Sequence, residues 1–329
     1  MALPSAGPAP MRLDPILEAQ LRAEGALTAP NLDELPLSEA LSLLRAPKPP
    51  YSPPTSEAAL VEDLTIPSPH GHAIPIRLYR PPAPSIYKIL LHFHGGGWVG
   101  GSMSNDDARC HALSQNANII IASVAYRLAP EHPYPAGLED AYAALLWLQA
   151  HASEIGANPR HIAIGGTSAG GNLAAATTIL ARDRNGPKIR FQLLTYPICD
   201  TTMSQPSYTE NANAPLLTTS MMAWFQKQYV PPGTDPHDPL IAPLQAPDLR
   251  NLPPALILTA ECDPLRDEAM QYATRLRAAG VPATSTCYLG MTHGFITRSP
   301  NHLQSQTAMR QIVDWLVEKH SEESFFEKI

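Results

Sequence analysis

Short runs of consecutive apolar residues alternate with helical patterns from residue 87 to the C-terminus. Such runs are typical of strands buried on both faces, and strands that alternate with helices form a mostly parallel sheet between two helical layers. Two segments with alternating polarity, 61–67 and 74–80, predict a hairpin at one edge of that sheet. The chain is therefore expected to fold as a three-layer α/β domain. The predicted strands cover 87–93, 118–124, 161–165, 190–195, 255–259 and 283–289, and the predicted helices cover 138–151, 169–183, 267–279 and 304–320.

Two further regions are rich in proline and should contain loops and short helices. Residues 1–60 hold two short amphipathic patterns, at 15–23 and 38–44, and a proline-rich linker at 46–55. Residues 197–254 hold one amphipathic segment, at 218–229. An insertion after a strand end lies over the edge of the sheet where α/β folds bind ligands. We therefore predict a helical cap, formed by residues 1–60 and an insertion at about 198–235, on a main domain of residues 61–329.

Composition argues against several classes of protein. With 44% apolar and 16% charged residues over 329 positions, the chain can bury a large core. A net charge of -7 without a basic cluster argues against nucleic-acid binding. No signal peptide and no apolar run of membrane-spanning length is evident, so we expect a cytoplasmic protein without a membrane span. The four cysteines have no metal-ligand spacing and are expected to be reduced core residues: Cys110, Cys199, Cys262 and Cys287.

Ser168 is the candidate nucleophile, because it lies in a Gly-x-Ser-x-Gly frame between a predicted strand and a predicted helix. The sharp turn that this frame forms lifts the hydroxyl out at the edge of the sheet. The frame also occurs by chance in glycine-containing loops. The strand before it and the helix of small residues after it argue against chance.

A serine hydroxyl attacks well only when a neighbouring base takes its proton. His293, on a loop after the last predicted strand, is the candidate base, and His302 is its nearest rival in the sequence. Asp263 follows the strand at 255–259 and would accept the ring N–H of that histidine. Glu261 and Asp267 are rivals for this role, although Asp267 is also suited to cap a helix.

Three glycines after the strand at 87–93, Gly95, Gly96 and Gly97, can point their N–H groups at a ligand. Together with the N–H of Ala169 at a helix start, they could hold a developing oxyanion. One such donor typically lowers a barrier by about 3–4 kcal/mol. A triple glycine can also be a flexible turn, but such a turn does not need a buried strand leading into it.

Other residues have two interpretations. His92 and His94 share one strand face and could bind a metal, but no third ligand with matching spacing is present, so we expect no metal site. A hydrogen bond from His94 to its own loop is the preferred interpretation. Several large side chains could either line a substrate pocket or form the core of the cap: Trp98, Met221, Met222, Trp224 and Phe225.

The order glycine loop, serine, aspartate, histidine is that of an acyl-transfer site in an α/β-hydrolase fold. In detail the chain resembles the bacterial hormone-sensitive-lipase-like esterases, the family IV carboxylesterases. The resemblance runs from about residue 60 to the C-terminus and rests on segments 94–98 (HGGGW), 126–132 (YRLAPEH) with Pro135 and Ala136, 166–171 (GTSAGG), 263–268 (DPLRDE) and 293–295 (HGF). The N-terminal segment agrees with the family only in length and helical character.

The resemblance implies a Ser168–Asp263–His293 triad and an oxyanion hole from Gly96, Gly97 and Ala169. It implies a cap and the hydrolysis of short- to medium-chain carboxylic esters by an acyl-enzyme and water, without a cofactor. Homodimers are frequent in the family. One departure is the residue before the nucleophile, a threonine at 167 where many members carry aspartate.

Two other functions are compatible with this scaffold. Plant gibberellin receptors resemble the family and bind a small ligand without catalysis, but they have lost the triad histidine that this chain keeps at 293. A hydrolase of another acyl bond, such as an amide, would differ only in its pocket and leaving-group geometry. Fold alone does not decide between these functions.

Overall fold

The computed structural model describes residues 12–47, 59–82 and 86–321, so most of the linker predicted at 46–55 lies outside the described residues. Its centre is a sheet of eight strands in the order β1-β2-β4-β3-β5-β6-β7-β8. The pairs β1–β2 and β2–β4 are antiparallel, and all other neighbours are parallel. The mostly parallel sheet with a hairpin at its edge is therefore confirmed. The strands are β1 Leu60–Pro67, β2 Ala73–Arg80, β3 Tyr87–Phe93, β4 Ile120–Val124, β5 Ala157–Thr167, β6 Gln192–Thr195, β7 Ala255–Cys262 and β8 Ala283–Thr292.

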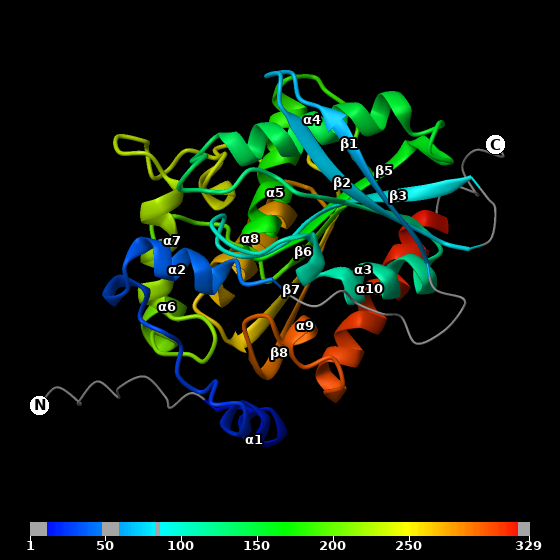
Figure 1. The fold of residues 1–329 in the computed structure, drawn as a ribbon. Coiled ribbons are helices and arrows are strands. Elements are labelled where there is room, and N and C mark those ends of the chain that lie inside the picture. The colour runs from blue at the N-terminus through cyan, green and yellow to red at the C-terminus, as the bar shows by residue number, and fades with distance from the viewer. Residues whose placement is uncertain (1–11, 48–58, 83–85, 322–329) are drawn as a thin grey trace, which may run out of the picture.

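Helices cover both faces of this sheet, which confirms the three-layer α/β arrangement (Figure 1). Helices α4, α5 and α8 pack with Ile89 and Leu91 of β3, whereas α3 and α10 pack in the cluster that contains Leu90. Neighbouring residues of β3 face opposite layers because successive side chains of a strand alternate. These helices are α3 Asp107–Ala117, α4 Ala136–His151, α5 Ala169–Asp183, α8 Arg266–Ala278 and α10 Leu303–Ser321. The sequence analysis did not predict α3.

The N-terminal helices go to two different places. Helix α2 (Leu37–Leu44) lies beside α7 (Thr219–Tyr229) in Figure 1, and the short 3-10 helix η1 (Leu32–Glu34) contacts α7. Helix α1 (Pro15–Ala23) instead buries Leu17 and Leu21 in the apolar cluster that also contains residues of α10 and of α9 (Phe295–Arg298). Of the N-terminal segment, only η1 and α2 therefore lie beside the insertion. The insertion also contains α6 (Ser207–Glu210).

Among the described helices, none combines the length and the apolar character that crossing a bilayer requires. All four cysteines are free thiols, and Cys287 is the one that is not fully buried.

Candidate active site

Three strands of the sheet end directly before the predicted catalytic residues. Strand β5 ends at residue 167, β7 at residue 262 and β8 at residue 292, so that Ser168, Asp263 and His293 are the next residues of the chain. These strands run parallel within the order β5-β6-β7-β8, and their carboxyl ends therefore meet at one edge. Cys262 pairs with Thr292, which brings the two following residues side by side.

Ser168 occupies a strained turn between β5 and α5. Its φ of 54° and ψ of -119° lie in a region that residues with a side chain rarely adopt. The N–H of Ser168 donates to the carbonyl of Thr195, which fixes the turn on the neighbouring strand β6. A Cβ atom at Gly170 would overlap the carbonyl groups of Phe93 and His94, so this turn can pack on β3 only with glycine there. Ser168 is therefore held in place, and the residue is 8% exposed.

The side chains of Ser168, His293 and Asp263 form one hydrogen-bonded row. The distance from His293 Nε2 to Ser168 Oγ is 3.0 Å, and that from His293 Nδ1 to Asp263 Oδ2 is 2.7 Å. Asp263 is fully buried, and its Oδ1 accepts the N–H of Leu265 at 2.9 Å. The ring of Tyr196 meets the His293 ring edge-on at 4.8 Å between centroids. The imidazole is therefore oriented by a carboxylate on one side and by an aromatic ring on another.

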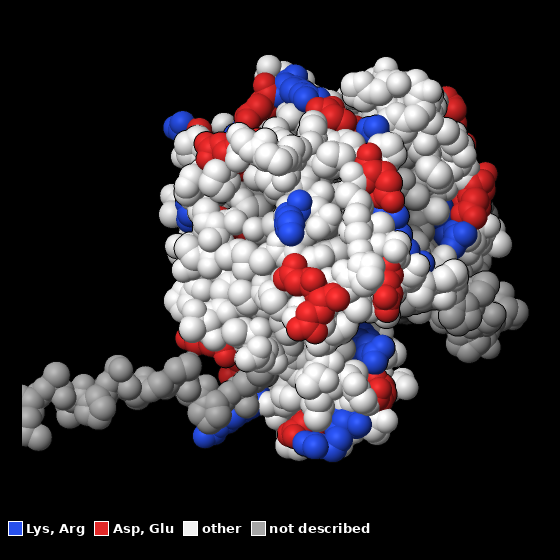
Figure 2. Space-filling model, turned by 60° about the vertical axis from the view of Figure 1, so that its left-hand side comes forward, with Lys and Arg blue, Asp and Glu red and all other residues white. Residues whose placement is uncertain are grey.

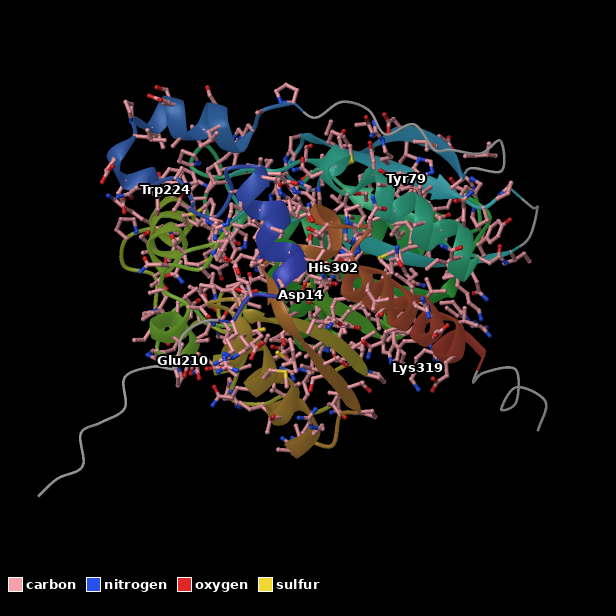
Figure 3. All side chains as sticks on the ribbon, turned by 90° about the horizontal axis from the view of Figure 1, so that it is seen from below. Asp14, Tyr79, Glu210, Trp224, His302 and Lys319 are labelled. Carbon is pink, nitrogen blue, oxygen red and sulfur yellow. The ribbon has the colours of Figure 1, made fainter. Side chains whose placement is uncertain are left out.

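The rival residues have other partners. His302 pairs with the N-cap residue of α1, Asp14, at 3.0 Å, and Figure 3 shows the two side chains next to each other. Glu261 Oε2 accepts the N–H of Gly290 at 2.7 Å. Asp267 lies in the first turn of α8 and accepts the N–H of Ser207 at 2.9 Å. None of the three is bonded to His293.

The glycine loop lies next to the serine. Gly96 and Gly97 have φ values of +128° and +61°, and a Cβ atom at Gly97 would overlap the ring of Phe225. Within the described part of the chain, no acceptor takes the N–H of Gly96, Gly97 or Ala169. The three N–H groups are therefore free to bind a ligand beside Ser168.

His94 forms the predicted hydrogen bond to its own glycine loop. Burial lowers the pKa of His94 to about 4, so the ring is neutral at neutral pH. Its Nδ1 lies 2.8 Å from the carbonyl oxygen of Gly95, to which it donates, and its ring stacks on Tyr126 at 4.4 Å. Arg45, at the end of α2, donates to the carbonyl of Val99 just beyond the loop and to that of Ala129. The glycine loop is thus rigid rather than a flexible turn.

A buried polar cluster behind the serine was missed by the sequence analysis. Asp106 Oδ2 accepts from His92 Nε2 at 2.8 Å and from Thr167 Oγ1 at 3.2 Å. Burial alone would raise the pKa of Asp106, but the hydrogen bond from His92 and the charges of His92 and Arg109 bring it down to about 2. His92 is hydrogen-bonded to Asp106 and His94 to the carbonyl of Gly95, so the two rings are not arranged as a pair of ligands for one metal ion. The described residues also contain no group of three His, Cys, Asp or Glu side chains that could hold one.

A cavity of about 270 Å³ opens above the serine. Of the residues predicted for a substrate pocket, Met221 and Phe225 line it. Trp98, Met222 and Trp224 are buried instead in the apolar core, where Trp98 stacks on the ring of Tyr229 at 4.4 Å. The cavity is lined by Leu44, Gly95, Gly96, Gly97, Gly100, Gly101, Asn105, Asp106, Thr167, Ser168, Tyr196, Leu216, Leu217, Met221, Phe225, His293, Gly294 and Thr297.

Comparisons with known proteins agree with this fold. A family model described as alpha/beta hydrolase fold matches residues 90–297. The carboxylic ester hydrolase LipN of Mycobacterium tuberculosis is 48% identical over 243 residues, which are 72% of this chain but 64% of LipN, just under two thirds of its length. Carboxylesterase NlhH of the same organism is 47% identical over 230 residues, 68% of this chain and 71% of NlhH. The solved structure of a hyperthermophilic esterase from the archaeon Pyrobaculum calidifontis matches with a TM-score of 0.82 and 37% identity, over 94% of this chain and 99% of its own.

Proposed function

The chain belongs to the α/β hydrolase family, among the bacterial hormone-sensitive-lipase-like esterases, and from this premise we propose that it is a serine carboxylesterase. Its substrates are short- to medium-chain carboxylic esters, which it hydrolyses through an acyl-enzyme. The observation that carries this proposal is the hydrogen-bonded row of Ser168, His293 and Asp263 at the wall of a cavity, beside three free N–H groups.

The chemistry follows from which atoms can donate. An ionised carboxylate only accepts hydrogen bonds, so His293 Nδ1 donates to Asp263 and Nε2 is left to accept the proton of Ser168. The serine oxygen attacks the ester carbonyl, and the carbonyl oxygen becomes an oxyanion that the N–H groups of Gly96, Gly97 and Ala169 bind. His293 then gives its proton to the leaving alcohol and later activates the water that releases the acid. No step requires a cofactor.

The size of the cavity at Ser168 supports a short chain at the reacting end of the ester. The cavity of about 270 Å³ is bounded by Leu217, Met221 and Phe225, which leave little room for a long chain. On the side of the molecule that carries α2 and α7, Figure 2 shows wide uncharged areas and, near the middle, a group of Asp and Glu side chains. We assign η1, α2 and the insertion with α7 to the cap, and α1 to the main domain.

A chain-length series of p-nitrophenyl esters, from acetate to palmitate, tests the proposal. We expect turnover to be highest for short and medium chains. Ser168→Ala should lower kcat by about 10⁶-fold with unchanged circular dichroism, whereas Ser153→Ala, at an exposed serine beyond the end of α4, serves as the matched control. Wild-type turnover in Ser168→Ala would refute the nucleophile.

Two alternatives give other outcomes in the same assay. A small-ligand receptor would bind the esters without turnover, and an amidase would hydrolyse the matching p-nitroanilides faster than the esters. Neither alternative is favoured by an observation in the structure. Assembly as a homodimer and a cytoplasmic location stay predictions, and sedimentation of the purified protein tests the first.

A further inference from the structure

A second cavity, of about 760 Å³, adjoins the active site. It lies between α3 and α10, which run side by side in Figures 1 and 3 and are in contact. Asn105 and Thr297 line both this cavity and the one above Ser168. The two cavities are therefore adjacent, and a ligand bound at the serine would reach the second cavity by passing these two residues.

The second cavity exists because α3 turns small side chains toward α10. Ala108 and Ala112 are one helical turn apart on α3 and line it, together with Ile296 from α9. Met309 and Val313 line it from α10, again one turn apart. The part of α10 that lines it, residues 306–313, is about 10 Å long at 1.5 Å per residue. The walls thus suit an extended apolar chain.

The charged groups of this cavity are all positive. Its lining contains Arg109 and Arg310 and no Asp or Glu side chain, in a protein whose net charge is -7. Arg310 is exposed and has no hydrogen-bond or ion-pair partner among the described residues. The side chains of Asn116 and Gln306 add amide donors to the same wall.

Arg109 places a second positive charge in the wall, and this one is buried. The residue is 4% exposed, and its Nη2 donates to Thr195 Oγ1 at 2.7 Å. Its Nε and Nη1 have no hydrogen-bond partner among the described residues. The guanidinium acts electrostatically on the nearby Asp106, and its unbonded Nε and Nη1 add positive potential on the side of the neighbouring cavity, which favours an anion there.

We propose that the cavity between α3 and α10 is a subsite for the far end of the substrate, and that it selects esters with a terminal carboxylate, such as monoesters of dicarboxylic acids. The ester group lies at Ser168, the apolar chain passes Thr297 and Asn105, and the carboxylate binds Arg310. This inference rests on the proposed esterase activity and names its substrate class. Because the subsite is about 10 Å long, suberate monoesters should profit from it more than succinate monoesters.

The test compares matched pairs of esters that differ in one terminal group. Wild-type enzyme should hydrolyse mono-p-nitrophenyl suberate with a lower KM than p-nitrophenyl octanoate, which has the same chain length. Arg310→Gln should raise the KM for the suberate monoester about tenfold, because a charge-assisted hydrogen bond is lost, and should leave the KM for the octanoate nearly unchanged. Arg160→Gln, at an exposed arginine outside this cavity, is the control and should change neither.

A second substrate arm and a second variant complete the test. The acetate ester of 8-hydroxyoctanoate carries its carboxylate on the alcohol side, so the arm that responds to Arg310→Gln identifies which half of the ester enters the subsite. Ala112→Phe, checked by thermal unfolding, should fill the cavity and remove the preference for the carboxylate. Equal KM changes for charged and neutral esters in Arg310→Gln would overturn the inference while leaving the esterase intact. The absence of any ester hydrolysis in the wild type would instead refute the proposed function.

Discussion

Replacing Asp263 by asparagine should lower kcat/KM by about 10⁴-fold without unfolding the protein. The carboxylate is fully buried and accepts two N–H groups, from Leu265 on Oδ1 at 2.9 Å and from His293 Nδ1 on Oδ2 at 2.7 Å. An asparagine has almost the same shape but presents one acceptor and one donor. Only one of the two N–H groups can therefore keep its acceptor.

Both orientations of the new amide slow the reaction. If the oxygen of the new amide keeps accepting the N–H of Leu265, the NH₂ group of the amide faces His293. The imidazole must then carry its proton on Nε2, so Nε2 can no longer accept the proton of Ser168. Such a tautomer costs about 10⁴ in rate. If the amide flips, the N–H of Leu265 is buried without an acceptor, at about 1–3 kcal/mol. The flipped amide also lacks the charge that stabilises the imidazolium, worth about 4 kcal/mol at 4 Å and an effective dielectric constant of 20. The flipped route thus costs about 5–7 kcal/mol, which is again at least 10³- to 10⁴-fold.

Hydrolysis of p-nitrophenyl butyrate by Asp263→Asn, with thermal unfolding as the fold control, measures this loss. Glu261→Gln is the matched control, because Glu261 is the rival carboxylate and a glutamine oxygen can still accept the N–H of Gly290. It should cost less than about tenfold. A loss below about 100-fold in Asp263→Asn, or a larger loss in Glu261→Gln, would contradict the assignment of Asp263 as the orienting acid.

Two further changes probe the fold and the pocket. Burial raises the pKa of Glu268 in the folded protein above its value in the unfolded chain. Between these two pKa values the folded protein keeps a proton that the unfolded chain has lost, so the free energy of unfolding falls as the pH rises through this range. Glu268→Gln cannot ionise and should raise the unfolding temperature relative to wild type more at pH 8 than at pH 5; an equal difference at both would refute the linkage. Phe225→Ala removes the ring that lies over Gly97 and lines the cavity, so the chain-length optimum should move to longer p-nitrophenyl esters, and an unchanged profile would argue against Phe225 as the limit.

The sequence predicted the strands well because buried strands give local signals, and the candidate site residues were inferred from signals of the same kind. Strands buried on both faces are long apolar runs, and the candidate nucleophile and base follow such runs directly. The end of β8 was missed, since Gly290 resembles the end of a strand and the prediction stopped at 289. In the structure a bulge absorbs this glycine, at φ +71°, and the strand continues to Thr292. That bulge restores the pairing of Thr292 with Cys262, which no local pattern of residues reveals.

Helix α3 and the position of α1 were out of reach for a different reason. Helix α3 buries polar side chains, among them Asp107, Arg109 and Ser114, so it lacks the apolar stripe by which a helix is recognised. Helix α1 has such a stripe, with Leu17 and Leu21 on it, but a stripe does not say which surface will cover it. The partner of α1 is decided by long-range contacts near the loop after β8, and those exist only in the folded chain.

The threonine before the nucleophile becomes intelligible once these long-range partners are known. Thr167 Oγ1 lies 3.2 Å from Asp106 Oδ2, and Asp106 is itself buried and paired with His92. The carboxylate next to the turn of the nucleophile is thus that of Asp106, directly before α3, and the hydroxyl of Thr167 is enough to bond to it. An aspartate at 167 would bring a second buried carboxylate into contact with the first, and one of the two would have to take up a proton. A neutral donor at this position therefore holds the turn of Ser168 without a charge conflict, and the departure from the family pattern leaves the geometry of the candidate nucleophile intact.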